Sequence, residues 1–233
     1  PPAAPPPRVA PTRILILGGG FAGVTTAEKL EKEFGADQAV SITLVSDTNA
    51  LLFTPMLAEV AASSLEATHI TTPLRTSLHR TQVVKGSATQ IDLQQRLVML
   101  APDAPIDGGA PPREGRVLQY DHLVLALGAV SNYLGMYNVE RFSFDFKSLA
   151  DAAKIRNHVI SLFDRADREP DPAIRQPLLT FVVAGGGFAG AELAGGLNDF
   201  VRGMLAYYPN IPPDEVKVGL VHSRGRILPE LSA

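Results

Sequence analysis

The first regular pattern along the chain is a short apolar run at residues 13–17, which three consecutive glycines end. Such a run is typical of a buried strand in a parallel sheet. A second apolar run follows at residues 41–45. Between the two, apolar residues recur at helical spacing, and Gly35 is expected to end this helix; they are Val24, Ala27, Leu30 and Phe34. The order predicts a strand–turn–helix–strand unit, long enough for a right-handed crossover between parallel strands.

The middle of the chain alternates between short helical and strand-like patterns. Residues 54–81 have a helical pattern in two pieces, interrupted at Pro55 and Pro73. Residues 82–101 alternate in short strand-like runs. The Pro- and Gly-rich segment 102–115 is interpreted as the tip of a hairpin.

Two further elements precede the last third of the chain. Residues 123–127 form another apolar run that ends in glycine, which predicts a buried strand. Ser148 and Asp151 have the spacing of a capping box, so a helix is expected from there to about residue 167. The polar, Pro-rich segment 169–177 is interpreted as a connector.

The opening pattern then occurs a second time. Residues 180–184 form an apolar run, and residues 185–190 read GGGFAG, as residues 18–23 do. A helical pattern and a final strand at residues 216–221 follow; the apolar positions of the helix are Leu193, Leu197, Phe200 and Met204. Two copies of one supersecondary unit predict an α/β fold with two Rossmann-like dinucleotide-binding units.

Both copies contain the G-x-G-x-x-G spacing of dinucleotide-binding turns. The first glycine allows the tight turn, the second lets the backbone approach a pyrophosphate, and the third lets the helix pack on the strand. The N–H groups at the helix N-terminus then bind phosphate. A strand before and a helix after each copy distinguish it from a glycine-rich turn that merely packs. The predicted binding residues are Gly18, Gly20, Phe21, Ala22 and Gly23 in the first copy, and Gly185, Gly187, Phe188, Ala189 and Gly190 in the second.

The ends of the second strands carry the residues expected near a ribose. In the first copy Asp47 is a candidate for binding the ribose hydroxyls, although Asp47 also starts a sequence typical of a turn. In the second copy no carboxylate occupies this place, and His222 and Arg224 follow the strand. A neutral His does not repel a 2′-phosphate and Arg224 could pair with one, or Arg224 is a solvated surface cation. NADH and NADPH therefore both stay open.

Composition excludes several other classes of site. The chain has 233 residues, 45% of them hydrophobic, a net charge of −3 without charge blocks, and no cysteine. A nucleic-acid partner, a disulfide and a thiolate metal site are therefore not expected. The five histidines lack metal-ligand spacing, so no metal site is predicted. Hydrolase and kinase motifs are also missing from the sequence.

These motifs together resemble the two-dinucleotide-binding flavoproteins, and among them the type II NADH dehydrogenases (NADH:quinone oxidoreductases). Besides the two glycine turns, the resemblance rests on residues 52–57, 73–75, 120–128, 132–135, 187–195 and 226–229. It implies a glutathione-reductase-like FAD/NAD(P)-binding fold, with FAD on the first turn and the nicotinamide dinucleotide on the second. The resemblance also implies residue roles: Ala126, Leu127 and Gly128 lie against FAD, Thr54 and Pro55 approach the isoalloxazine, and Ala88 contacts the adenine end.

Glu192 is the residue that the resemblance places near the nicotinamide, and it is the candidate catalytic residue. The alternative is a carboxylate that only complements the positive end of its helix. Three departures from the family stand out. The family's ribose carboxylate falls where Ser46 stands, so Asp47 is displaced by one residue, and His222 replaces the corresponding acid of the second copy. No Gly-Asp pair of the kind that binds the flavin ribityl-phosphate occurs in the sequence.

The resemblance extends the expectation to whole domains. We expect a Pro-rich tail at 1–11, the N-terminal part of an FAD-binding domain at 12–145, a helix and linker at 146–177, and the first half of an NAD(P)-binding domain at 178–233. Both binding units are then incomplete, and the C-terminal membrane anchor of the family falls outside this chain. A chain that begins with Pro rather than Met is expected to have been shortened.

The implied activity is hydride transfer from NADH or NADPH to FAD, followed by delivery of two electrons to a quinone. The absence of cysteine disfavours the relatives that work through thiols. A related reductase that uses ferredoxin, rubredoxin or oxygen as acceptor is one alternative, and a non-catalytic nucleotide-binding fragment is another. The expected location is cytoplasmic, peripheral on the inner face of the membrane, and exposed apolar edges could pair two copies into a homo-oligomer.

Overall fold

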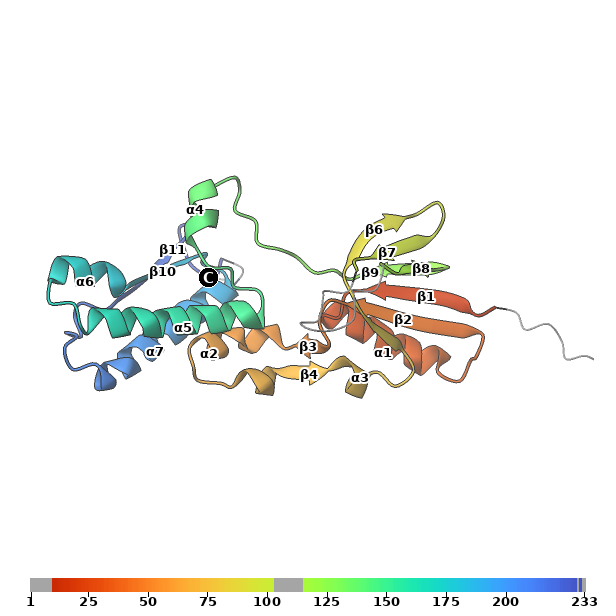
Figure 1. Ribbon diagram of the computed structural model, residues 1–233, viewed down its shortest axis with the longest axis horizontal. Helices are drawn as coiled ribbons and strands as arrows, with labels where there is room; N and C mark the ends of the chain where they lie inside the picture. The colour runs from red at the N-terminus through yellow and green to blue at the C-terminus, as the bar shows by residue number, and fades with distance from the viewer. Residues whose placement is uncertain (1–9, 103–114, 230, 232–233) are drawn as a thin grey trace, which may run out of the picture. The chain divides into compact units, whose positions relative to one another are not determined.

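The computed structural model describes residues 10–102, 115–229 and 231, which form two compact units. Unit 1 contains the described residues up to 51 together with 71–129, and unit 2 contains 52–70 together with the described residues from 130 onward (Figure 1). This division differs from the expected domains, because the helix expected as a linker belongs to unit 2, as does the short excursion 52–70.

A four-stranded parallel sheet forms the centre of unit 1, in the order β5-β2-β1-β9. Its strands are β1 (Thr12–Leu17), β2 (Val40–Ser46), β5 (Gln82–Lys85) and β9 (His122–Leu125). Helix α1 (Phe21–Phe34) makes the crossover from β1 to β2. Ile16 packs in a cluster with Val24 and Ala27 of α1, while Leu15 and Leu17 enter another cluster. Alternate side chains of β1 therefore fill two cores on opposite faces of the sheet.

The second cluster is covered by an antiparallel sheet, β6-β7-β8. Its strands are β6 (Ala88–Asp92), β7 (Leu97–Leu100) and β8 (Val117–Gln119). Val98 and Leu100 of β7 pack with Leu15 and Leu17 of β1. The strand-like pattern predicted for residues 82–101 is confirmed, whereas the hairpin tip predicted at 102–115 falls, apart from its ends, outside the described residues.

Residues 50–77 are shorter and more varied than the two helical pieces that the sequence predicts. They form β3 (Ala50–Leu52), η1 (Thr54–Met56), α2 (Leu57–Ala61), η2 (Ala67–Ile70), β4 (Thr71–Pro73) and α3 (Leu74–Ser77). Strands β3 and β4 pair with each other. Pro55 lies at the start of η1, and Pro73 ends β4 and precedes α3, which are positions where the missing N–H of proline costs no helical hydrogen bond.

Unit 2 packs a two-stranded parallel sheet against helices. The sheet is β10 (Thr180–Ala184) with β11 (Lys217–Val221), and the long helices are α5 (Leu149–Ala166) and α7 (Phe188–Met204). The predicted capping box of α5 is confirmed, with Ser148 and Asp151 bonding each other's backbone. One core joins α2, α5, α7 and the sheet; its members include Val60, Phe163, Phe181, Leu197 and Val201.

Three short helices complete unit 2: α4 (Tyr137–Phe142), α6 (Pro172–Leu178) and η3 (Leu205–Tyr207). Helix α6 corrects the connector expected at 169–177. Asp171 caps it by accepting from the backbone N–H of Ala173 at 2.8 Å, and Pro172 occupies the first turn, where its missing N–H is not needed. Over the described ranges, the structure contains no helix that is both long and apolar enough to cross a membrane.

Candidate functional site: two glycine turns

The first glycine turn links β1 to α1 in unit 1. Gly18 has a φ of 114°, which residues other than glycine rarely adopt. Its N–H donates to the carbonyl of Val45 at 2.8 Å. Gly20 then precedes α1, and its carbonyl accepts the first helical hydrogen bond from Val24 at 3.0 Å. The turn therefore joins the end of β1 to the end of β2 and starts the helix at the carboxyl edge of the sheet.

The second turn has the same geometry in unit 2. Gly185 has a φ of 123°, and its N–H donates to Val221 at the end of β11 at 2.9 Å. Gly187 precedes α7 with φ −79° and ψ −175°, against −81° and −172° for Gly20. The repeat seen in the sequence is thus a repeat in backbone conformation.

The third glycine of each turn is required by the fold itself. A Cβ on Gly23 would lie 1.8 Å from the carbonyl oxygen of Gly18, and one on Gly190 would lie 1.9 Å from that of Gly185. Both distances are far inside van der Waals contact with backbone atoms that cannot rotate away. Only glycine therefore lets each helix begin this close to its strand.

The second glycine of each turn faces open space instead. A Cβ on Gly20 or Gly187 would meet no described atom within 4 Å. Neither residue has a side chain to cap its helix, and neither first turn contains an acidic residue. Each helix therefore presents an uncapped positive end beside an open space, which is the arrangement that accommodates a pyrophosphate.

The end of β9 completes the edge of unit 1. The N–H of Ala126 donates to the carbonyl of Leu17 at 2.8 Å, and a Cβ on Gly18 would lie 2.0 Å from the carbonyl oxygen of Ala126. Leu127 is exposed beside it, and Gly128 has a φ of 73°. The structure thus brings residues 126–128 next to the first turn, while Ala88 begins β6 and packs, partly buried, against the core of this unit.

The two candidates at the end of β2 have different environments. Ser46 is buried. It packs closely beneath the turn, since a Cβ on Gly19 would lie only 2.4 Å from its Oγ atom. The same oxygen accepts from the N–H of Thr48 at 3.3 Å. Asp47 is exposed to solvent at the edge of the sheet. The close packing of Ser46 against Gly19 joins residues distant in sequence, and no local pattern indicated it.

His222 holds the matching place at the end of β11. Its Nδ1 atom accepts from the N–H of Gly186 at 3.1 Å, and a Cβ on Gly186 would lie 2.6 Å from the imidazole ring. The Nε2 atom is buried and has no hydrogen-bond partner among the described residues. Arg224 is exposed, and Leu228 donates back to the carbonyl of Gly186 at 2.6 Å. The segment after β11 therefore folds back onto the second turn.

The remaining candidates, Thr54, Pro55 and Glu192, also belong to unit 2. Thr54 and Pro55 are exposed residues of η1. Glu192 is exposed on α7, beyond the first turn of that helix, so the carboxylate does not cap the helix. Among the described residues, no group of three or more His, Asp or Glu has the arrangement of a metal site.

An ion pair that the sequence analysis did not anticipate supports the first turn from the opposite edge of the sheet. Arg13 at the start of β1 donates through Nε at 3.1 Å and Nη2 at 3.0 Å to the two carboxylate oxygens of Asp121, just before β9. The Arg13 side-chain and backbone hydrogen bonds hold the pKa of Asp121 at about 2, against an ordinary 3.8. The pair fixes the relative position of the two strands that carry the turn and residues 126–128.

A partly buried carboxylate anchors α1. Glu31 accepts from three consecutive backbone N–H groups, those of His79, Arg80 and Thr81, at 3.2, 3.0 and 2.7 Å. Burial of this carboxyl opposes its ionisation, but the hydrogen bonds outweigh that effect, so the pKa of Glu31 is lowered. The residues are far apart in sequence, so no motif could have revealed the contact.

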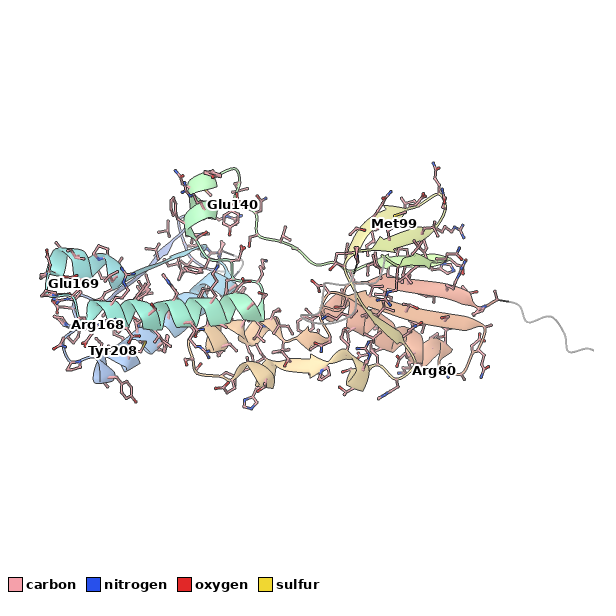
Figure 2. All side chains as sticks on the ribbon, in the orientation of Figure 1. Arg80, Met99, Glu140, Arg168, Glu169 and Tyr208 are labelled. Carbon is pink, nitrogen blue, oxygen red and sulfur yellow. The ribbon has the colours of Figure 1, made fainter. Side chains whose placement is uncertain are left out.

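Two hollows in unit 2 are lined by none of the residues of the glycine turns. One, of about 360 Å³, is lined by Asp164, Asp167, Arg168 and Tyr208. Figure 2 labels two of these residues, Arg168 and Tyr208. The Tyr208 hydroxyl donates to Asp164 at 2.9 Å and Asn210 donates to Asp167, so its polar groups satisfy one another. The other, of about 630 Å³, is an open hollow between residues 62–64 and one face of α7. Neither includes a predicted site residue.

Comparison with known proteins gives consistent matches along the chain. The family model described as pyridine nucleotide-disulphide oxidoreductase matches residues 12–233. The type II NADH:quinone oxidoreductase Ndh of Mycobacterium tuberculosis is 33% identical over 238 positions, covering 100% of this chain and 48% of that protein. The external alternative NADH-ubiquinone oxidoreductase of Yarrowia lipolytica is 30% identical, covering 94% of this chain and 37% of that protein.

A solved structure supports the fold. NDH2 from Plasmodium falciparum superimposes with a TM-score of 0.82 at 20% identity, covering 95% of this chain and 43% of that one. The chain thus spans about half the length, or less, of the relatives that it matches. The predicted α/β fold of the FAD/NAD(P)-binding type is confirmed, and the chain belongs to the pyridine nucleotide-disulphide oxidoreductase family.

Proposed function

We propose that this chain is the dinucleotide-binding part of an FAD-dependent NAD(P)H:quinone oxidoreductase. One observation carries the proposal: two glycine turns of nearly identical conformation, each with an uncapped helix N-terminus facing open space. One such turn is enough for one dinucleotide, whereas two in one chain fit a flavin dinucleotide and a nicotinamide dinucleotide. Unit 1 would hold FAD and unit 2 would hold NADH or NADPH.

In unit 1 the backbone does most of the binding. The N–H groups at the start of α1 would hold the FAD pyrophosphate, with Gly20 giving it room. Asp47 is the exposed carboxylate at the end of β2 and would accept from the ribose hydroxyls, while Ser46 beneath it supports Gly19. Residues 126–128 would lie along the dinucleotide, and Ala88 would contact the adenine end.

In unit 2 the start of α7 would hold the pyrophosphate of the nicotinamide coenzyme in the same way. Glu192 would lie near the nicotinamide, and Thr54 with Pro55 would approach the isoalloxazine. A bound flavin supplies the redox chemistry itself, accepting a hydride and releasing two electrons. The chain's own residues bind and orient the coenzymes, and its sequence contains no cysteine for a thiol step.

The acceptor and the location extend the proposal to the whole protein. The relatives from Mycobacterium tuberculosis and Yarrowia lipolytica are named as quinone and ubiquinone oxidoreductases, which supports a quinone as acceptor. We therefore propose a peripheral enzyme on the inner, cytoplasmic face of a membrane, and the exposed apolar side chains of the chain leave pairing into a homo-oligomer open.

The test blocks nucleotide binding at one glycine turn at a time. At Gly20 and Gly187 an added Cβ would meet no described atom within 4 Å, so we expect Gly20→Val and Gly187→Val to fold. Gly20→Val should purify without flavin. Gly187→Val should keep its flavin but lose NADH and NADPH binding, measured by visible absorption and by calorimetric titration. Gly195→Ala, at an open position within α7, is the control.

Two results would contradict the proposal. Equal loss of both nucleotides in either variant would rule out separate sites. Flavin that binds but is never bleached by NADH or NADPH in the complete protein would favour the non-catalytic nucleotide-binding alternative.

A further inference from the structure

We propose that His222 and Arg224 make the second turn selective for a coenzyme that carries a 2′-phosphate, so that NADPH rather than NADH is the nicotinamide substrate. This inference rests on the proposed function, because it requires the second turn to bind that coenzyme. The supporting observation is the kind of side chain at the end of β11, because the adenosine ribose of a dinucleotide lies there in this type of unit.

The imidazole of His222 is fixed in place by the turn itself. The N–H of Gly186 donates to its Nδ1 atom at 3.1 Å, and the ring occupies the space where a side chain on Gly186 would be. The backbone of Gly186 also accepts from Leu228, so the segment after the strand is held beside the same residue. His222 and the residues that follow it therefore stay at the edge where the turn lies.

That hydrogen bond decides which nitrogen carries the proton. Nδ1 accepts from a backbone N–H, so it has no proton, and the neutral ring is assigned its proton on Nε2. Nε2 is thus a donor, and the described residues offer it no acceptor. This atom is buried, so His222 affects a ligand through what it replaces: a neutral ring stands where a carboxylate would repel a 2′-phosphate.

Arg224 adds a positive charge to the same edge. Its side chain is exposed and has no hydrogen bond or ion pair with the described residues. Arg226 differs, because its guanidinium donates to the carbonyl of Pro229. The sequence has no Asp or Glu from residue 216 to 229. The end of β11 therefore offers donors and positive charge, which suit a phosphate and leave a ribose 2′-hydroxyl without a carboxylate partner.

The first unit provides an internal comparison. The counterpart of His222 in the first unit is Ser46, because each packs against the second residue of its turn. The exposed residue after Ser46 is Asp47, an acceptor that suits ribose hydroxyls and repels phosphate, whereas the residues after His222 include the exposed Arg224. FAD carries no 2′-phosphate, so the two units, which share their turn geometry, differ in charge just after these strands. This difference is independent of the His222 tautomer.

The test uses the two adenosine ends alone, so that hydride transfer is not needed. We expect 2′,5′-ADP to bind the full chain at least tenfold more tightly than 5′-AMP, which differs from it only by the 2′-phosphate, in isothermal titration calorimetry. Arg224→Ala should remove most of this difference and leave 5′-AMP binding unchanged. Arg165→Ala, which removes an exposed Arg on α5 of the same unit, should change neither affinity.

Charge reversal gives a second, opposite readout. His222→Glu should reverse the preference in favour of 5′-AMP, and the ratio of flavin-bleaching rates with NADPH and NADH should fall at least tenfold. If circular dichroism shows that His222→Glu does not fold, Arg224→Glu at the exposed position must produce the reversal alone.

The outcomes separate this inference from the proposed function. Equal or weaker binding of 2′,5′-ADP, or a parallel loss of both nucleotides in Arg224→Ala, would overturn the 2′-phosphate selectivity while a working NADH reaction kept the proposed function intact. Failure of NADH, NADPH, 2′,5′-ADP and 5′-AMP to bind would overturn the proposed function and the inference together.

Discussion

At the residue scale, the glycines of each turn have different tasks. Gly23 and Gly190 are required by the fold, because any Cβ there would overlap the carbonyl oxygen of the first glycine. Gly20 and Gly187 have room for a side chain, so their value lies in what they leave open for a ligand. The motif in the sequence treats these positions alike, and the structure shows which substitutions change stability and which change binding.

This distinction predicts opposite effects for two substitutions in the same helix. Gly190→Ala should destabilise unit 2 by about 3 kcal/mol or more, because overpacking against a backbone atom cannot be relieved by a rotamer change. Gly195→Ala, with no atom within 4 Å, should stabilise it by about 0.5–1 kcal/mol through helix propensity. Denaturant unfolding measures both, and equal effects would contradict the assigned role of Gly190.

How much of the site the sequence could predict depends on the distance between partners. The glycine turns and the residues after each strand follow from local patterns, since strand, turn and helix are contiguous. The packing of Ser46 on Gly19 and the hydrogen bond from Gly186 to His222 join residues separated by a whole crossover. These tertiary contacts determine that Ser46 is buried and which nitrogen of His222 carries the proton. The periodicity of apolar residues in the sequence contains no information on such contacts.

At the element scale, helix α1 is held by polar contacts as well as by its apolar face. Glu31 accepts hydrogen bonds from three consecutive backbone N–H groups between α3 and β5. These donors lie outside a helix or sheet, and the carboxylate supplies the acceptor for them. The pKa of Glu31 is lowered despite burial of the carboxyl, which shows that the hydrogen bonds outweigh desolvation.

Glu31→Gln should therefore destabilise the protein by about 1–3 kcal/mol, because an amide offers one acceptor oxygen where the carboxylate offers two, and no charge. Glu33→Gln, two residues later on the same helix and exposed, is the matched control and should change the free energy of unfolding by less than about 0.5 kcal/mol. Similar losses in both variants would show that the contact with residues 79–81 contributes little.

The ion pair between Arg13 and Asp121 predicts a pH dependence. The pKa of Asp121 is about 2 in the folded protein against 3.8 ordinarily, so its ionised form is favoured by folding. This contribution is fully present above the unfolded value and is lost as the pH falls from about 4 toward 2.

Urea unfolding at pH 6 and pH 3 should show a smaller loss of stability in Asp121→Asn than in the unchanged protein. Asp214→Asn, an exposed substitution in unit 2, should lose as much as the unchanged protein does. An identical pH dependence in all three would mean that the pair does not couple folding to ionisation.

The longer elements followed their sequence patterns, whereas the short pieces of residues 54–77 did not. Strands β1, β2, β10 and β11 and helices α1, α5 and α7 have enough residues for a periodic pattern to be recognised. Helix α6 is capped by Asp171 and begins with Pro172, so its prolines indicated a connector although the first is compatible with a helix start. Residues 54–77 divide into pieces of three to five residues, too short for a helical period to be expressed.

At the scale of the whole molecule, the chain builds separate cores. The clusters around Leu15 and Ile16 contain only residues of unit 1, and the cluster around Phe163 contains only residues of unit 2. Phe163 is fully buried and contacts the rings of Phe181 and Tyr208. Each unit therefore has its own source of apolar stabilisation.

Phe163→Ala should accordingly destabilise unit 2 by about 3–5 kcal/mol through the cavity it leaves. Hydrogen exchange followed by mass spectrometry should show faster exchange in α5, α7 and β10, with β1 and β2 of unit 1 unchanged. Faster exchange throughout both units would contradict separate cores and indicate one cooperative folding unit.

The excursion of residues 52–70 into unit 2 has a consequence for dissecting the protein. The chain passes between the units at three places, after residues 51, 70 and 129. A protease that nicks any one of them leaves the units tethered by the other two, so a single cut cannot release either. A gene fragment that begins at residue 130 would lack Leu57 and Val60, which belong to the core of its own unit. A free-standing first unit would instead need residue 51 joined directly to residue 71, where β3 and β4 already run side by side.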